Sequence, residues 1–71
     1  IMDFTQEERM LMMIYNPGSR EKLVVELETM KGQLHPGERR LLRLTDTVIG
    51  KLRKITDEEF ERIDLYPDVE A

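Results

Sequence analysis

The chain has 71 residues, with 15 acidic and 11 Lys or Arg side chains, a formal net charge of −4, and no cysteine. The lack of cysteine excludes disulfides, thiolate nucleophiles and zinc–thiolate sites. No apolar run approaches the roughly 18–20 residues of a membrane span and no signal peptide is visible, so we expect residues 1–71 to form one small cytoplasmic domain.

The first predicted helix spans about Gln6 to Tyr15. It begins at a T-x-x-E capping box, in which the side chains of Thr5 and Glu8 each satisfy the backbone N–H of the other residue. Met12 is harder to place inside, and we assign it to the surface. The apolar face of this helix is predicted to consist of Met10, Leu11, Met13, Ile14 and Tyr15.

A second helix is predicted to end shortly before Gly32, which we expect to act as a left-handed terminator. Two starts are open. Asn16 can cap the helix with Pro17 at its first position, which we favour, or Ser19 can cap it one turn later. Val25 is expected to point outward. The inward stripe repeats at helical spacing and consists of Leu23, Leu27, Met30 and Leu34, with Val24 beside it.

The longest predicted helix lies between residues 37 and 55 and has two unlike faces. Gly50 interrupts its polar side, which suggests a close approach by another element. The apolar face comprises Leu41, Leu44, Thr45, Val48, Leu52 and Ile55, with Leu42 and Ile49 at its edge. The basic face comprises Arg39, Arg40, Arg43, Lys51, Arg53 and Lys54.

The last predicted helix begins at a second capping box, formed by Thr56 and Glu59. We expect it to span about Asp57 to Leu65, followed by a frayed tail at 68–71. With short loops throughout, the chain predicts an all-α fold, a small bundle of three to four antiparallel helices.

The charges are distributed unevenly. Residues 36–55 carry six bases and two acids, net +4, whereas residues 56–71 carry seven acids and one base, net −6. We therefore expect the basic face of the third helix to be at least partly paired with the acidic last helix.

The basic face also raises an alternative function, DNA binding. The candidate contacts are Arg39, Arg40, Arg43, Lys51 and Lys54. A sequence pI near 4.9 disfavours this function, and no aromatic residues are interleaved with the bases to stack on single strands. Helices two and three could resemble a helix-turn-helix, although their connection is not distinctive.

Residue patterns for catalysis, metals or cofactors are lacking. His35 is the only histidine, and the spacing of the C-terminal carboxylates does not match a calcium loop. We therefore expect no enzymatic activity, no metal and no cofactor.

Protein contact is the favoured function. Methionine adapts well to partner surfaces, so Met12, if exposed together with Tyr15 and Val25, would make an apolar patch for another helix or a second copy. The candidate contact residues are Met12, Tyr15, Glu58, Glu61 and Tyr66.

Several segments of the chain together resemble one protein family. They are Phe4–Glu8, Ile14–Tyr15, Ser19–Arg20, Glu26–Leu27, Thr56–Phe60 and, most specific, the ending Asp64–Asp68. With these segments the chain resembles, over nearly its whole length, the putative transposon-transfer assisting proteins of bacterial conjugative transposons. The resemblance implies a helical accessory protein whose partner is an unidentified protein of the transfer machinery, and it supplies no catalytic or binding residues.

Overall fold

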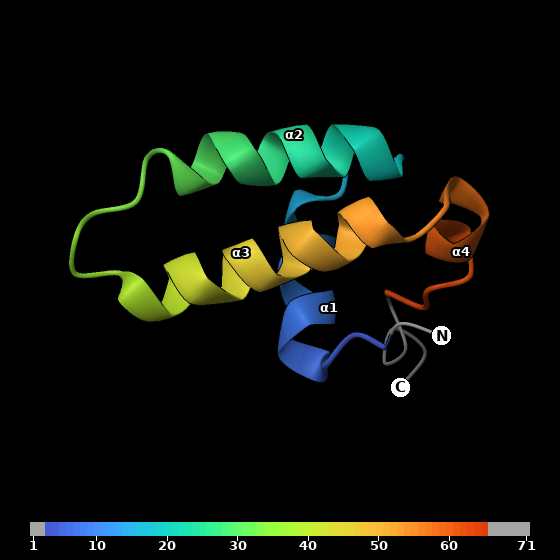
Figure 1. Cartoon of the computed structure of the whole chain (residues 1–71), viewed down its shortest axis with the longest axis horizontal. Helices are drawn as coiled ribbons and strands as arrows, with labels where there is room; N and C mark the ends of the chain where they lie inside the picture. The colour runs from blue at the N-terminus through green and yellow to red at the C-terminus, as the bar shows by residue number, and fades with distance from the viewer. Residues whose placement is uncertain (1–2, 66–71) are drawn as a thin grey trace.

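Four helices make up most of the computed structural model, which describes residues 3–65 (Figure 1). None of these residues lies in a strand, so the predicted all-α class is confirmed. The predicted tail at 68–71 lies outside the described residues. The helices are α1 (Gln6–Tyr15), α2 (Arg20–Lys31), α3 (Arg39–Lys54) and α4 (Asp57–Glu61).

Both predicted capping boxes are present. Thr5 Oγ1 accepts a hydrogen bond from the Glu8 N–H at 3.1 Å, and Glu8 Oε1 accepts one from the Thr5 N–H at 2.9 Å. Thr56 and Glu59 repeat the arrangement at the start of α4 with distances of 3.0 and 2.8 Å. The hydrogen bond from the Thr56 backbone lowers the pKa of Glu59, since it stabilises the carboxylate form.

The favoured start of α2 at Asn16–Pro17 is wrong, and the alternative at Ser19 is confirmed. Ser19 caps α2 by accepting from the Lys22 N–H at 3.2 Å. The Asn16 side chain is used locally instead, accepting from the Gly18 N–H at 2.9 Å. Gly18 has a φ of +112°, which no helical residue adopts, so the turn delays the helix.

Two helix ends also differ from prediction. Gly32 ends α2 with right-handed angles, φ −66° and ψ −14°, and not in the left-handed conformation. α4 ends at Glu61, because the N–H groups of Arg62 and Ile63 bond three residues back and tighten the last turn. A helix continued to Leu65 would point that side chain about 140° away from Phe60, whereas both are buried in the core.

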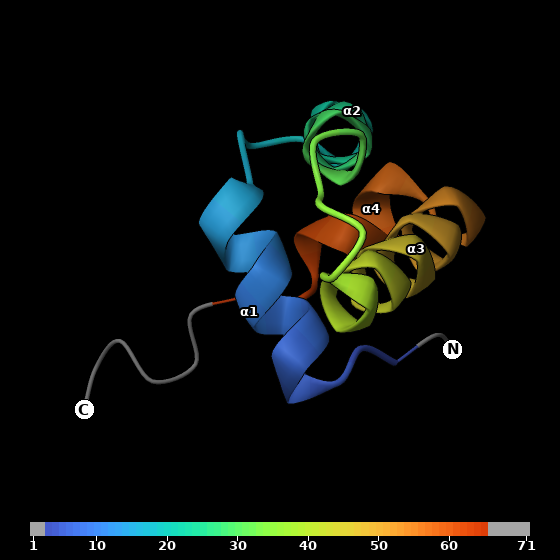
Figure 2. The same cartoon turned by 90° about the vertical axis from the view of Figure 1, so that its left-hand side faces the viewer.

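The core lies between α1 and an antiparallel pair formed by α2 and α3 (Figure 1). α1 crosses this pair on one side (Figure 2). The buried hydroxyl of Thr45 is satisfied by donating to the Leu41 carbonyl at 2.8 Å. The buried apolar residues are Phe4, Leu11, Met12, Leu23, Leu27, Val48, Ile49, Leu52, Ile55, Phe60 and Leu65.

The inward face of α1 is only partly the predicted one: Leu11 is buried, and Met13 and Tyr15 pack against the core as predicted. Met12, assigned to the surface, is 0% exposed, whereas Met10 and Ile14, assigned to the core, are 51% and 67% exposed. Glu8 faces inward together with Leu11 and Met12. The reason is that the six consecutive apolar residues 10–15 cover every side of this helix. Which side is buried therefore depends on packing against the other helices.

Gly50 gives no support to the predicted close approach. A Cβ built on this residue would meet no neighbouring atom within 4 Å. The glycine is therefore not required by packing.

Candidate interaction surface

α1 presents an apolar stripe to solvent. Glu7, Met10 and Ile14 are spaced three and four residues apart, which places them on one side of the helix. That side lies opposite the buried Met12, and the buried Leu11 lies at its edge. Single exposed apolar side chains are ordinary, but Met10 and Ile14 lie a turn apart and form a patch. Together with the carboxylate of Glu7 at its start, we call this patch the α1 stripe (Glu7, Met10 and Ile14).

Cations from α3 reach the first residue of this stripe. A guanidinium nitrogen of Arg40 lies 3.0 Å from Glu7 Oε2, and the Arg40 side chain is 88% exposed. Arg39 and Arg43 are exposed on the same side of α3, one turn apart. Within residues 3–65 neither forms an ion pair. Arg39, Arg40 and Arg43 therefore form an exposed cluster, the α3 arginine cluster, which meets the α1 stripe through Arg40.

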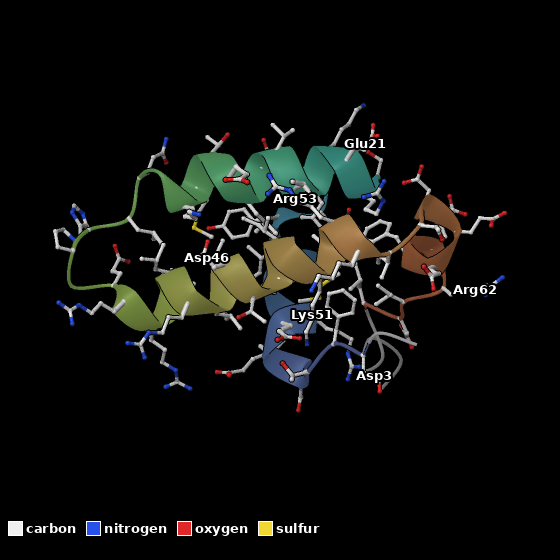
Figure 3. All side chains as sticks on the ribbon, in the orientation of Figure 1. Asp3, Glu21, Asp46, Lys51, Arg53 and Arg62 are labelled. Carbon is white, nitrogen blue, oxygen red and sulfur yellow. The ribbon has the colours of Figure 1, made fainter. Side chains whose placement is uncertain are left out.

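Two of the other three cations of α3, Lys51 and Arg53, are engaged within the fold, whereas Lys54 is exposed and forms no ion pair within residues 3–65. Lys51 Nζ lies 2.7 Å from Glu8 Oε1 and also donates to the Asp3 carbonyl at 2.9 Å. The same ammonium group lies 5.5 Å from the centre of the Phe4 ring, within the range of a cation–π contact. Figure 3 shows Lys51 where α3 passes α1. Lys51 thus holds the N-terminal segment, although its sequence position suggested a contact to nucleic acid.

The charged side chains of α3 form ion pairs with helices other than the predicted α4. Arg53 lies between α3 and α2 (Figure 3) and pairs with Glu28 on α2. Lys31 on α2 lies 2.6 Å from Asp46 on α3. The Asp46 hydrogen bond raises the pKa of Lys31, because it favours the ammonium form. For the residues described, the ion pairs of α3 run to α1 and α2, so the expected pairing with the acidic α4 is wrong.

The acidic end of the molecule forms a second candidate surface. Glu58 and Glu61 are exposed on α4, whereas Tyr15 is half-buried against the core. Tyr66, the remaining predicted contact residue, lies outside the described part of the chain. Met12 is fully buried, so its predicted role in a surface patch with Tyr15 and Val25 is wrong.

Arg20 joins α2 to the start of α4, a role the sequence did not reveal. Its Nε lies 2.8 Å from Asp57 Oδ1, and another of its guanidinium nitrogens donates to the Leu52 carbonyl at 3.0 Å. Arg20 also lines a hollow of about 150 Å³ together with Phe60 and Glu61. Pockets for small molecules usually enclose about 300–1,000 Å³, so this hollow does not favour a small-molecule site.

Metal ligands are likewise not gathered in the part of the chain the structure describes. No group of three or more His, Asp or Glu side chains there is placed to hold an ion. In residues 3–65 no helix is long and apolar enough to cross a membrane.

A protein-family model described as putative transposon-transfer assisting protein matches residues 4–67. The chain belongs to this family. The match includes all four helices, and therefore both the α1 stripe and the α3 arginine cluster. No match was found among curated proteins or among solved structures.

Two features of the surface had a signal in the sequence. Met10 and Ile14 are four residues apart, and Arg39 and Arg43 repeat that spacing on α3. Spacing alone groups such residues on one side of a helix. It does not say whether that side faces the core, which depends on the neighbouring helices.

Proposed function

We propose that this family member assists transposon transfer as a non-enzymatic, cytoplasmic accessory protein of a conjugative transposon, acting by contact with another protein of the transfer machinery. The family description supports the role in transfer. The exposed α1 stripe supports the mode of action, because a partner would bury it.

The observation that carries this proposal is the exposure of two large apolar side chains on one side of α1. Met10 and Ile14 are among the few large apolar residues that the described chain leaves exposed. Burying a side chain of this size contributes about 1.5–3 kcal/mol. A pair of them can therefore anchor a partner, as clustered apolar residues do at the centre of protein interfaces. Glu58 and Glu61 remain candidate contacts on α4.

Site-specific photo-crosslinking tests the proposal. A photoreactive phenylalanine derivative is placed at position 14 of the full chain in cells that carry the transposon. The matched control is position 25, where Val25 is similarly exposed, at 61%, but belongs to α2. We expect a protein to be crosslinked from position 14 and not from position 25.

A functional readout accompanies the crosslinking. Ile14→Asp should weaken the contact about tenfold or more, given the burial energy of the side chain, and should lower the frequency of transfer. Val25→Asp should leave the frequency unchanged. If position 14 gives no more crosslinked protein than position 25, the proposed contact does not exist.

A further inference from the structure

The α1 stripe and the α3 arginine cluster belong to one surface. The ion pair between Arg40 and Glu7 joins them, since Glu7 is the first residue of the stripe and Arg40 a member of the cluster. Met10 follows Glu7 by three residues, and Ile14 follows Met10 by four, on the same side of α1. A partner lying along α1 would therefore contact the apolar side chains of Met10 and Ile14, and at the Glu7 end of the stripe it would contact guanidinium groups of α3.

We infer that the partner segment is an acidic amphipathic helix. Its apolar side would cover Met10 and Ile14, and its carboxylates would meet the guanidinium groups of the α3 arginine cluster. This inference rests on the proposed function and adds to it the chemistry of the partner. An amphipathic helix fits because its residues at i, i+3, i+4 and i+7 match a stripe of the same spacing.

The charges of the described chain point to an acidic partner. The molecule has a net charge of −4, so an acidic segment is attracted only where cations are concentrated and unpaired. Arg39 and Arg43 meet this condition, because they are exposed and form no ion pair within residues 3–65. Complementary charges of this kind mainly set specificity and the rate of association.

Helix stability does not explain why these arginines stand at the start of α3. The first turn of α3 contains no acidic residue, and the Glu38 side chain makes no capping hydrogen bond to the helix. Cations at this end of a helix are disfavoured by its dipole. The arginine cluster therefore lowers the stability of the start of α3, which is consistent with a role in binding.

A nucleic acid fits the same surface less well. Of the cations on α3, Lys51 is bound to Glu8 and Asp3, and Arg53 is paired with Glu28. Arg39, Arg43 and Lys54 form no ion pair within residues 3–65, but they lie at opposite ends of α3, so few cations remain together to follow a phosphate backbone. A nucleic acid would also leave Met10 and Ile14 uncovered.

The test measures binding of labelled peptides to the full chain by fluorescence anisotropy. The probe is an amphipathic peptide of about 20 residues, roughly 30 Å when helical, with leucines along one side and glutamates flanking them. One control peptide has the same composition in scrambled order. A second has lysines in place of the glutamates, and a labelled DNA duplex of about 20 base pairs serves as the nucleic-acid probe.

Two pairs of variants separate the proposed surface from general effects. Arg43→Glu is matched by Lys54→Glu, an exposed cation at the other end of α3, and Ile14→Asp is matched by Val25→Asp. We expect Arg43→Glu and Ile14→Asp each to weaken binding of the acidic peptide about tenfold. Lys54→Glu and Val25→Asp should change it by less than about twofold.

Several outcomes would contradict the inference that the partner is an acidic amphipathic helix. These are equal binding of the lysine peptide or of the scrambled peptide, equal effects of the matched variants, or tighter binding of the duplex with dependence on Arg43. If crosslinking from position 14 persists in any of these cases, the contact role stands and only the chemistry assigned to the partner is wrong. Loss of that crosslinking overturns the proposed function itself.

Discussion

The ammonium nitrogen of Lys51 on α3 lies 2.7 Å from the carboxylate of Glu8 on α1, although the two residues are 43 positions apart in the chain. The Glu8 side chain is 6% exposed, and the same oxygen accepts the capping hydrogen bond from Thr5. Because Lys51 also bonds to the Asp3 carbonyl, one side chain ties the N-terminal segment and α1 to α3.

Lys51→Met should destabilise the protein strongly. Removing one partner of a buried ion pair typically costs about 3–5 kcal/mol, because the other charge is left uncompensated. We expect the low end of that range, since Glu8 keeps its bond from Thr5. The free energy of unfolding is measured by urea titration followed by circular dichroism.

The double variant Glu8→Gln/Lys51→Met provides the control for this prediction. It removes both charges, and the glutamine can still accept from Thr5, so it should be more stable than Lys51→Met alone. Together with Glu8→Gln alone, the double variant completes a mutant cycle, and a double-variant cost equal to the sum of the two single costs would show that the charges are not energetically coupled.

Met12→Ala and Met10→Ala should differ widely in their effects. Met12 is fully buried, so its truncation should cost about 2–5 kcal/mol through lost burial and the cavity left behind. Met10 is half exposed, and its truncation should change stability by less than about 0.5 kcal/mol. Thermal unfolding compares the two variants, and equal costs would mean that α1 is oriented differently.

Substitution of two glycines by alanine should have opposite signs. Gly50→Ala should stabilise the protein by about 0.5–1 kcal/mol, because the new methyl group meets no neighbour and alanine favours the helix. Gly18→Ala should destabilise it by about 1–2 kcal/mol, because a φ of +112° strains any residue with a Cβ. Urea titration measures both, and a destabilised Gly50→Ala variant would contradict the open space around this residue.

The capping carboxylate of Glu59 should make stability depend on acid pH. The folded-state pKa of Glu59 lies below its ordinary value of 4.5, so its contribution is fully present above that pH. This contribution is lost as the pH falls from about 4.5 through the lowered pKa. Glu59→Gln keeps the capping oxygen but cannot titrate, so between these pH values its stability should fall less than that of the wild type. Parallel acid titrations of the unfolding free energy test this, and identical slopes would contradict it.

The sequence by itself determined the features that depend on residues close together in the chain. Thr5 with Glu8 and Thr56 with Glu59 are three positions apart, so the capping boxes were evident before any tertiary structure. The amphipathic pattern of α3 was equally clear, because its apolar and basic residues separate cleanly at helical spacing. These local interactions also sufficed to predict the all-α class.

Only the tertiary structure decided which side of α1 faces inward. Residues 10–15 are all apolar, so helical periodicity selects no face, and only the structure shows that α1 buries Glu8, Leu11 and Met12. The same is true of the ion pairs, because charge blocks in a sequence do not specify which helices become neighbours. The cations of α3 pair with Glu7 and Glu8 on α1 and with Glu28 on α2, although the acids of α4 are nearer to them in sequence. Packing of distant helices thus exposed Met10 and Ile14 on the helix that Arg40 reaches through Glu7, and so created the surface proposed to bind a partner.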